Sequence, residues 1–360
     1  MEAGVFWLAF TFGIHIVLVN LGIGISVIAP ILKELGLRRS DDKLVLEAYR
    51  LLRFYAATYA LGGVFGTAFT VYLLSYYPGF ISVLGRMALY NYAVAITALV
   101  MHFLSLTIYY YGWNRLGRGI HNLFGALLAS SALVIVLGFR SVFAQLNTPV
   151  GVELGEVIRV DPLQALIGNK MLPPLFVKSV SAALAATMVS MAAWNTIKGR
   201  RDIAVMYARP GIILLFIVLL AGLWYAWELR AVEYKFNNIF GGFGIGGEPR
   251  LNLSWLLAFK AVLWIIQVVW LHRLLRGRGG WMAYIAGPSA LLGIVAGEYL
   301  NAFSQYPYFI AGGLPEGLKD ELTLYSTNIH TSSEALQVIT VSATGILILA
   351  AILYLYTTMY

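Results

Sequence analysis

Long apolar stretches constrain this chain more than any other feature of its sequence. The first covers residues 3–32 and contains one readily ionisable side chain, His15. A helix of that length, rising about 1.5 Å per residue, is longer than the roughly 30 Å hydrocarbon layer of a membrane. Hydrophobic residues make up 60% of the chain and charged residues 12%, against about 25% charged in soluble domains. The sequence therefore predicts an all-α, polytopic membrane protein.

Nine membrane spans are expected, and they form a single transmembrane domain over residues 1–360. They cover residues 4–32, 53–79, 87–113, 119–146, 172–197, 207–229, 252–273, 281–304 and 335–358. The first is expected to be retained rather than cleaved, because Glu2 follows Met1 where a signal peptide has a basic segment, and because the apolar run is too long.

The basic residues indicate how the chain is oriented. The formal net charge is +8, and most of the 25 Lys and Arg residues fall in short loops that share one side of the membrane if the N-terminus is outside. The positive-inside rule then predicts a cytoplasmic C-terminus. Because this rule accounts for the charge, no nucleic-acid partner is expected. The chain has no cysteine, which excludes disulfides, iron–sulfur clusters, thiolate haem ligation and covalent haem attachment.

Ionisable residues within the expected spans are candidates for function, because burying them in lipid is costly. His15 and His102 are each either an axial haem ligand or a buried histidine satisfied by a neighbouring helix. Lys260 and Glu298 lie in consecutive spans, where they neutralise each other, contact a haem propionate or relay protons. Lys178 is near the end of its span, where its amine can reach the interface.

Several motifs occur in an order that resembles subunit I of the cytochrome bd quinol oxidases. The most specific is Gly-Trp-Asn-Arg-Leu-Gly at 112–117, followed by His121. The others are Ile14-His15 with Gly22 and Gly24, and the runs 60–63, 145–151 and 194–200, with weaker likeness at 258–260 and 305–308. The resemblance covers most of residues 10–200. Nine spans with the N-terminus outside is also the topology of that family.

The resemblance implies a ligand set that is only partly present. His15 matches the family histidine that ligates one haem of the oxygen-reducing pair. The histidine and methionine of the low-spin b haem are replaced by Lys178 and Val262. The glutamate of the second high-spin haem falls at Val295, with Glu298 one helical turn away as a displaced substitute. Valine cannot bind iron, so a low-spin b haem is not expected here.

Other family positions also differ in this chain. Two family glutamates near the haem and the proton path fall at Val94 and His102, and Lys260 replaces an arginine. The long hydrophilic loop that receives quinol in the family is reduced to residues 230–251. Quinol oxidation by this subunit alone is therefore not expected.

These likenesses and losses predict a degenerate paralogue of subunit I in a prokaryotic cell membrane. Its expected partner is a complete, haem-bearing subunit I, in a complex that oxidises quinol and reduces oxygen to water. Haem is expected either once, through His15, or only in the partner. Small residues at 182–186 and at 62–66 are candidates for the interface. The alternatives are an independent haem electron-transfer protein using His15, and a transporter with Lys260, Glu298 and His102 along a polar path.

Overall fold

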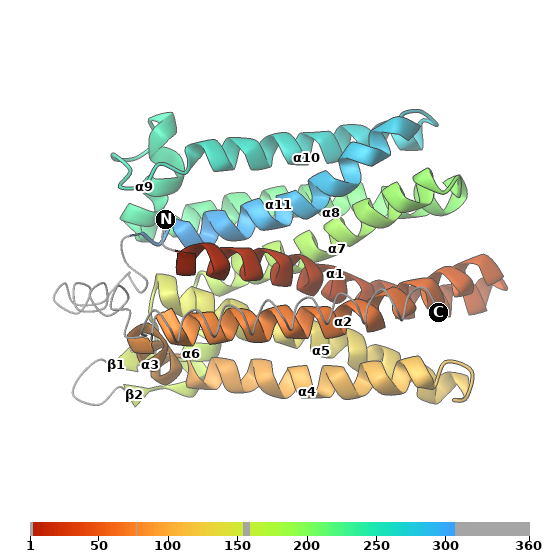
Figure 1. The fold of residues 1–360 in the computed structure, drawn as a ribbon, viewed down its shortest axis with the longest axis horizontal. Coiled ribbons are helices and arrows are strands. Elements are labelled where there is room, and N and C mark those ends of the chain that lie inside the picture. Colours follow the sequence, from red (N-terminus) through yellow and green to blue (C-terminus); the bar gives the residue numbers. More distant parts are fainter. Residues whose placement is uncertain (1–2, 77, 154–158, 307–360) are drawn as a thin grey trace. The chain divides into compact units, whose positions relative to one another are not determined.

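The computed structural model describes residues 3–76, 78–153 and 159–306 (Figure 1). Within these residues, eight helices are long and apolar enough to cross a membrane. Helix is the expected spanning structure, because lipid offers no partner for unpaired backbone groups. The all-α polytopic fold is thereby confirmed. The expected span at 335–358 lies outside the described residues.

The chain folds into two compact units, with the change between residues 135 and 136. The prediction of one domain over the whole chain stays a prediction. The first unit contains α1 (Ala3–Arg39), α2 (Asp42–Tyr76), α3 (Pro78–Met87), α4 (Leu89–Tyr111) and the first part of α5 (Arg118–Asn147).

Helices α1 and α2 pack along each other in the first unit and extend beyond the expected spans. The sequence predicts that the second span starts at residue 53, but α2 starts at Asp42. Its added turns bury Leu44, Ala48, Leu51 and Leu52, which are at most 6% exposed. Their spacing puts them on one helix face, so packing rather than lipid contact sustains these turns.

The second unit begins within α5 and is built around α7 and α8. Its further elements are β1 (Val152–Glu153), β2 (Arg159–Val160), α6 (Pro162–Ile167), α7 (Leu172–Ile197), α8 (Arg201–Glu228), η1 (Leu229–Ala231), α9 (Glu233–Phe240), η2 (Gly241–Phe243), α10 (Ser254–Leu275), η3 (Gly280–Met282) and α11 (Ala283–Phe303). The two strands pair antiparallel, with Val152 opposite Val160. Helix α11 packs on α7 and α10, and α10 also packs on α8.

The small residues expected at a subunit interface are used largely inside the chain. On α7, Ala183, Ala185 and Ala186 are at most 4% exposed. On α2, Gly66 faces the His15 ring and Gly62 lies next to Leu18. These positions bring the chain's own helices close together, and an interface at the two runs stays a prediction.

Candidate functional site

His15 is held by the neighbouring helix in a defined tautomer. Its Nδ1 lies 2.8 Å from the carbonyl oxygen of Gly62 on α2. A carbonyl oxygen only accepts, so Nδ1 carries the hydrogen and Nε2 keeps its lone pair. Metal-binding histidines commonly use such a hydrogen bond from the second ring nitrogen. The ring is therefore suited to bind iron through Nε2.

The absence of a side chain at Gly66 makes room for this ring. A Cβ atom at that position would lie 2.6 Å from His15 Cε1 and 2.9 Å from Nδ1. Those separations are well inside ordinary van der Waals contact at about 3.5–4.0 Å. Gly63, on another face of the same helix, has nothing within 4 Å of such an atom.

His102 is buried among three other helices and is 2% exposed. Its Nε2 lies 2.6 Å from the hydroxyl of Tyr55 and 3.5 Å from Ser26 Oγ, and its Nδ1 lies 3.0 Å from Ser131 Oγ. Both ring nitrogens thus have protein partners. This geometry favours the satisfied core histidine over the haem ligand.

The two histidines do not share a site. Ser26, the α1 residue next to His102, follows His15 by eleven positions on the same helix. At about 1.5 Å per residue this separation is roughly 16 Å along α1. The structure therefore separates them into two places within the first unit.

Glu298 in the second unit forms an ion pair with Arg140, and its neutralisation by Lys260 stays a prediction. Arg140 Nη1 donates to Glu298 Oε2 at 3.0 Å, and Nη2 donates to Oε1. The two side chains are 9% and 14% exposed. Sequence reasoning misses Arg140 because it counts this residue with the outward-facing segments, whereas α5 carries it and continues to Asn147. The unbroken apolar run around it was the available signal.

Lys178 and Lys260 are also in this part of the second unit. The Lys178 Nζ lies 4.9 Å from the centre of the Tyr225 ring, so this amine faces an aromatic side chain of the bundle. Lys260 lies against α11, where a Cβ atom at Gly297 would be 2.8 Å from its Nζ. Both ammonium groups act electrostatically on Glu298. The structure thus brings together Lys178, Lys260 and Glu298, which the sequence singled out. Arg140 is a fourth member that the sequence did not single out.

A buried lysine that sequence reasoning placed in a loop anchors a polar network nearby. Lys235 on α9 is fully buried, and its Nζ donates to Asn147 Oδ1 at 2.8 Å and to Asn301 Oδ1 at 3.1 Å. Tyr225 donates to the same Asn301 oxygen at 3.0 Å. Burial lowers the pKa of Lys235 well below its usual value, and repulsion from Lys178 adds to this. Asn147, within the 145–151 motif, was the available signal.

The positions that correspond to the family's other haem ligands do not form a ligand pair. Val262 on α10 is 53% exposed, and Val295 on α11 is half-buried. The Glu298 carboxylate has both oxygens bound by Arg140. The residues present do not fit a low-spin haem. The described residues also contain no group of three or more His, Cys, Asp or Glu placed to hold a metal ion.

The Gly-Trp motif and His121 hold the α4–α5 turn against α1. Lys33 on α1 is 7% exposed and lies 4.0 Å from the Trp113 ring centre. Its Nζ is 3.0 Å from His121 Nδ1, while His121 Nε2 is 3.1 Å from the Tyr109 carbonyl oxygen. The carbonyl fixes the hydrogen on Nε2, so Lys33 donates to Nδ1. This motif therefore has a structural function in this chain.

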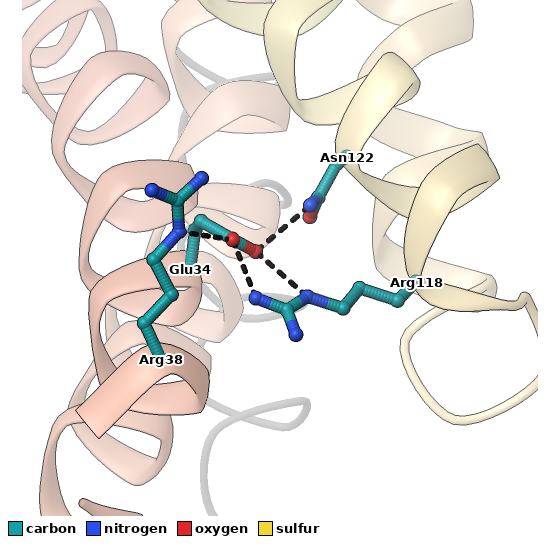
Figure 2. A network of polar contacts seen from close by, with 4 residues as sticks. All are labelled: Glu34, Arg38, Arg118 and Asn122. Carbon is teal, nitrogen blue, oxygen red and sulfur yellow. Dashed lines mark hydrogen bonds and ion pairs between the residues drawn. The ribbon is translucent and has the colours of Figure 1, made fainter. Parts of the chain in front are cut away.

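Glu34, the next residue on α1, ties the same ends together (Figure 2). Its carboxylate accepts from Arg118 Nη2 at 2.6 Å and Nε at 3.2 Å, from Asn122 Nδ2 at 2.8 Å, and from Arg38 Nε at 2.6 Å. Arg118 and Asn122 begin α5, whereas Arg38 belongs to the last turn of α1. One carboxylate thus joins two helix ends.

Fold and sequence define the class as an all-α, multi-pass membrane protein of a respiratory oxidoreductase family. Residues 6–231 match the family of the cytochrome bd terminal oxidase subunit I, and the chain belongs to this family. The resemblance expected from the motifs is confirmed.

Two known proteins show how far the similarity extends. A putative cytochrome bd menaquinol oxidase subunit I of Bacillus subtilis (strain 168) is 26% identical over 201 residues. That match covers 53% of this chain and 44% of the relative, which is less than half of its length. The bd oxidase of Geobacillus thermodenitrificans matches in structure with a TM-score of 0.78 at 20% identity, over 98% of this chain and 96% of that one. This second similarity shows a shared fold.

Proposed function

We propose that this chain is a subunit-I-like component of a cytochrome bd-type terminal oxidase that supports a complete, haem-bearing subunit I. The complex would lie in a prokaryotic cell membrane, with the N-terminus of this chain outside. One observation favours this role beside a haem-bearing subunit. It is the ionic cluster of Arg140, Lys178, Lys260 and Glu298. Within it, Lys178 stands where the resemblance implies a haem-binding histidine, and Glu298, the displaced substitute for the ligand position at Val295, has both carboxylate oxygens engaged by Arg140.

His15 is the residue we propose for haem ligation in this chain. Its Nδ1–H bond to the Gly62 carbonyl orients the ring and leaves Nε2 for iron. A haem bound there would supply a redox-active iron. His102 and Glu298 are not proposed as ligands, because their hydrogen bonds engage the atoms that would have to bind the metal. For Lys260, a role toward a haem propionate stays a prediction.

Quinol oxidation is proposed for the complex and not for this chain alone. The reduced loop at 230–251 consists largely of α9, η2 and a turn with left-handed glycines at 244 and 246. Asn237 accepts from the backbone nitrogen of Gly247 at 2.9 Å and closes this turn. The compact loop offers little of the hydrophilic segment that receives quinol in the family.

An independent haem electron carrier is the second candidate, and the His15 tautomer favours it as well. The two candidate functions differ in whether an oxidase subunit co-purifies with the chain. The test is purification from the native membrane in mild detergent, with a pyridine-haemochrome spectrum and identification of co-purifying subunits. A stoichiometric second subunit carrying most of the haem supports the proposal. Haem on this chain without an oxidase partner favours the electron carrier.

A pair of variants tests His15 itself. His15→Ala is expected to remove the haem absorbance that belongs to this chain. His272→Ala is the matched control, because His272 is an exposed histidine at the end of α10. Equal haem content in both variants would show that His15 is not a ligand.

A further inference from the structure

Tyr55 and His102 form a short, buried hydrogen bond in the first unit. Tyr55 on α2 is 4% exposed and His102 on α4 is 2% exposed. The Tyr55 hydroxyl oxygen lies 2.6 Å from His102 Nε2, at the short end of the usual range for hydrogen bonds in proteins. The Tyr55 hydroxyl and His102 Nε2 are therefore hydrogen-bond partners for each other within the protein.

The neighbours of His102 determine which of its two ring nitrogens carries the hydrogen. Ser131 Oγ lies 3.0 Å from Nδ1, and its hydroxyl donates its own hydrogen to the Leu128 carbonyl at 3.1 Å, so this oxygen can only accept from the ring. The ring hydrogen is therefore on Nδ1, and Nε2 accepts from the Tyr55 phenol. Ser26 does not compete, because its hydroxyl donates to the Gly22 carbonyl at 2.7 Å.

We propose that Tyr55 is a redox-active tyrosine and that His102 is its proton acceptor. When Tyr55 loses one electron to an oxidant, its O–H bond breaks and the proton forms an N–H bond at His102 Nε2. The products are a neutral tyrosyl radical and an imidazolium, and return of an electron reverses both changes. A proton acceptor within hydrogen-bond reach is required, because water is excluded at this depth.

The oxidant is a strong one-electron acceptor of the metal-centre class, of the kind that oxygen reduction at a haem iron generates. Three contacts order the α1–α2 interface: His15 against Gly66, Leu18 against Gly62, and Gly22 against Tyr55. Gly22 follows His15 by seven residues, which is about 10 Å along the helix. This link to a haem site rests on the proposed function, whereas the Tyr55–His102 pair stands on its own geometry.

The test uses the detergent-purified protein with its co-purifying subunits and an external oxidant, photogenerated tris(bipyridine)ruthenium(III). An EPR radical signal that narrows when tyrosine is deuterated is expected, and Tyr55→Phe is expected to abolish it. Tyr59→Phe is the matched control. The Tyr59 ring lies 5.9 Å from the His102 ring, as does the Tyr55 ring, but of these two tyrosines only Tyr55 is hydrogen-bonded to His102 within the described residues. A signal that survives Tyr55→Phe, or no tyrosyl signal in the wild type, overturns the proposal.

Two further variants keep the test decisive if Tyr55→Phe does not fold. Replacement of Tyr55 by 3,5-difluorotyrosine retains the ring and hydroxyl, and it is expected to change the hyperfine splitting of the radical. His102→Gln can accept a hydrogen bond but cannot take a proton, so the radical is expected to be lost. Unchanged splitting, or a full signal in His102→Gln, contradicts the assignment. His15→Ala should leave this externally driven radical intact, so a failure of haem ligation is distinguishable from a failure of the Tyr55–His102 pair.

Discussion

Removing either partner of the Arg140–Glu298 pair is expected to destabilise the second unit unequally. Both side chains are largely buried, at 9% and 14% exposure, and two hydrogen bonds join them. Breaking a buried ion pair by removing one partner costs about 3–5 kcal/mol, because the remaining charge is left uncompensated. The surrounding charges determine which loss is larger.

Glu298→Gln leaves Arg140 beside Lys178 and Lys260 with no anion from this cluster, so the full cost of about 3–5 kcal/mol is expected. Arg140→Gln leaves the carboxylate with those two lysines, which compensate it in part. A smaller loss, about 1–3 kcal/mol, is expected there. The double variant should cost less than the sum of the two, with a coupling of roughly 0.5–3 kcal/mol.

The assay is the free energy of unfolding in mixed micelles, measured by denaturant titration for the wild type, both single variants and the double variant. Glu233→Gln is the control, because Glu233 is an exposed carboxylate of the same unit. Additive losses would show that the pair contributes no coupling. Equal losses in the two single variants would refute the compensating effect of the lysines.

Three further perturbations have defined outcomes. Gly66→Ala should lower the free energy of unfolding by about 1–3 kcal/mol through overpacking against His15, and it should lower the haem content. The control Gly63→Ala should leave the haem spectrum unchanged. Equal haem spectra in the two variants would refute the packing of the His15 ring against Gly66 as a condition for haem binding. Lys235 has a folded-state pKa below its usual value of 10.5, so it destabilises the protein at low pH, and stability should rise as pH increases from the lowered pKa toward 10.5. Lys235→Met should flatten that slope in denaturant titrations, and an unchanged slope would contradict it. Glu34→Gln should lower the melting temperature less than Glu298→Gln does, by an amount that high salt removes; a salt-independent loss would contradict this.

The membrane fold is predictable because long apolar runs in lipid must form helices, whatever their partners are. Helix α7 is predicted at 172–197 and is observed as Leu172–Ile197. The start of α2 lies eleven residues before its predicted position, because a charged sequence resembles a loop. Those residues form a helix because one face, with Leu44, Ala48 and Leu51, packs against the protein.

The candidate site shows the same division between local and tertiary information. His15 stands out in the sequence as an ionisable group in an apolar span, but its tautomer depends on the Gly62 carbonyl of another helix. The sequence places Glu298 near Lys260 alone, and packing adds Arg140 from α5 as the ion-pair partner of its carboxylate. Lys235 has the surroundings of a loop residue in the sequence, and α9 places it next to Asn147.

The sequence by itself determined the fold class and the family resemblance, because each depends on residue type and order along the chain. Only the tertiary structure decided which charges meet, which imidazole nitrogen is free and that Tyr55 donates to His102. These properties depend on distances of a few ångströms between side chains on different helices. Residue spacing within one helix does not fix the rotation of that helix against its neighbours, so packing alone sets these distances.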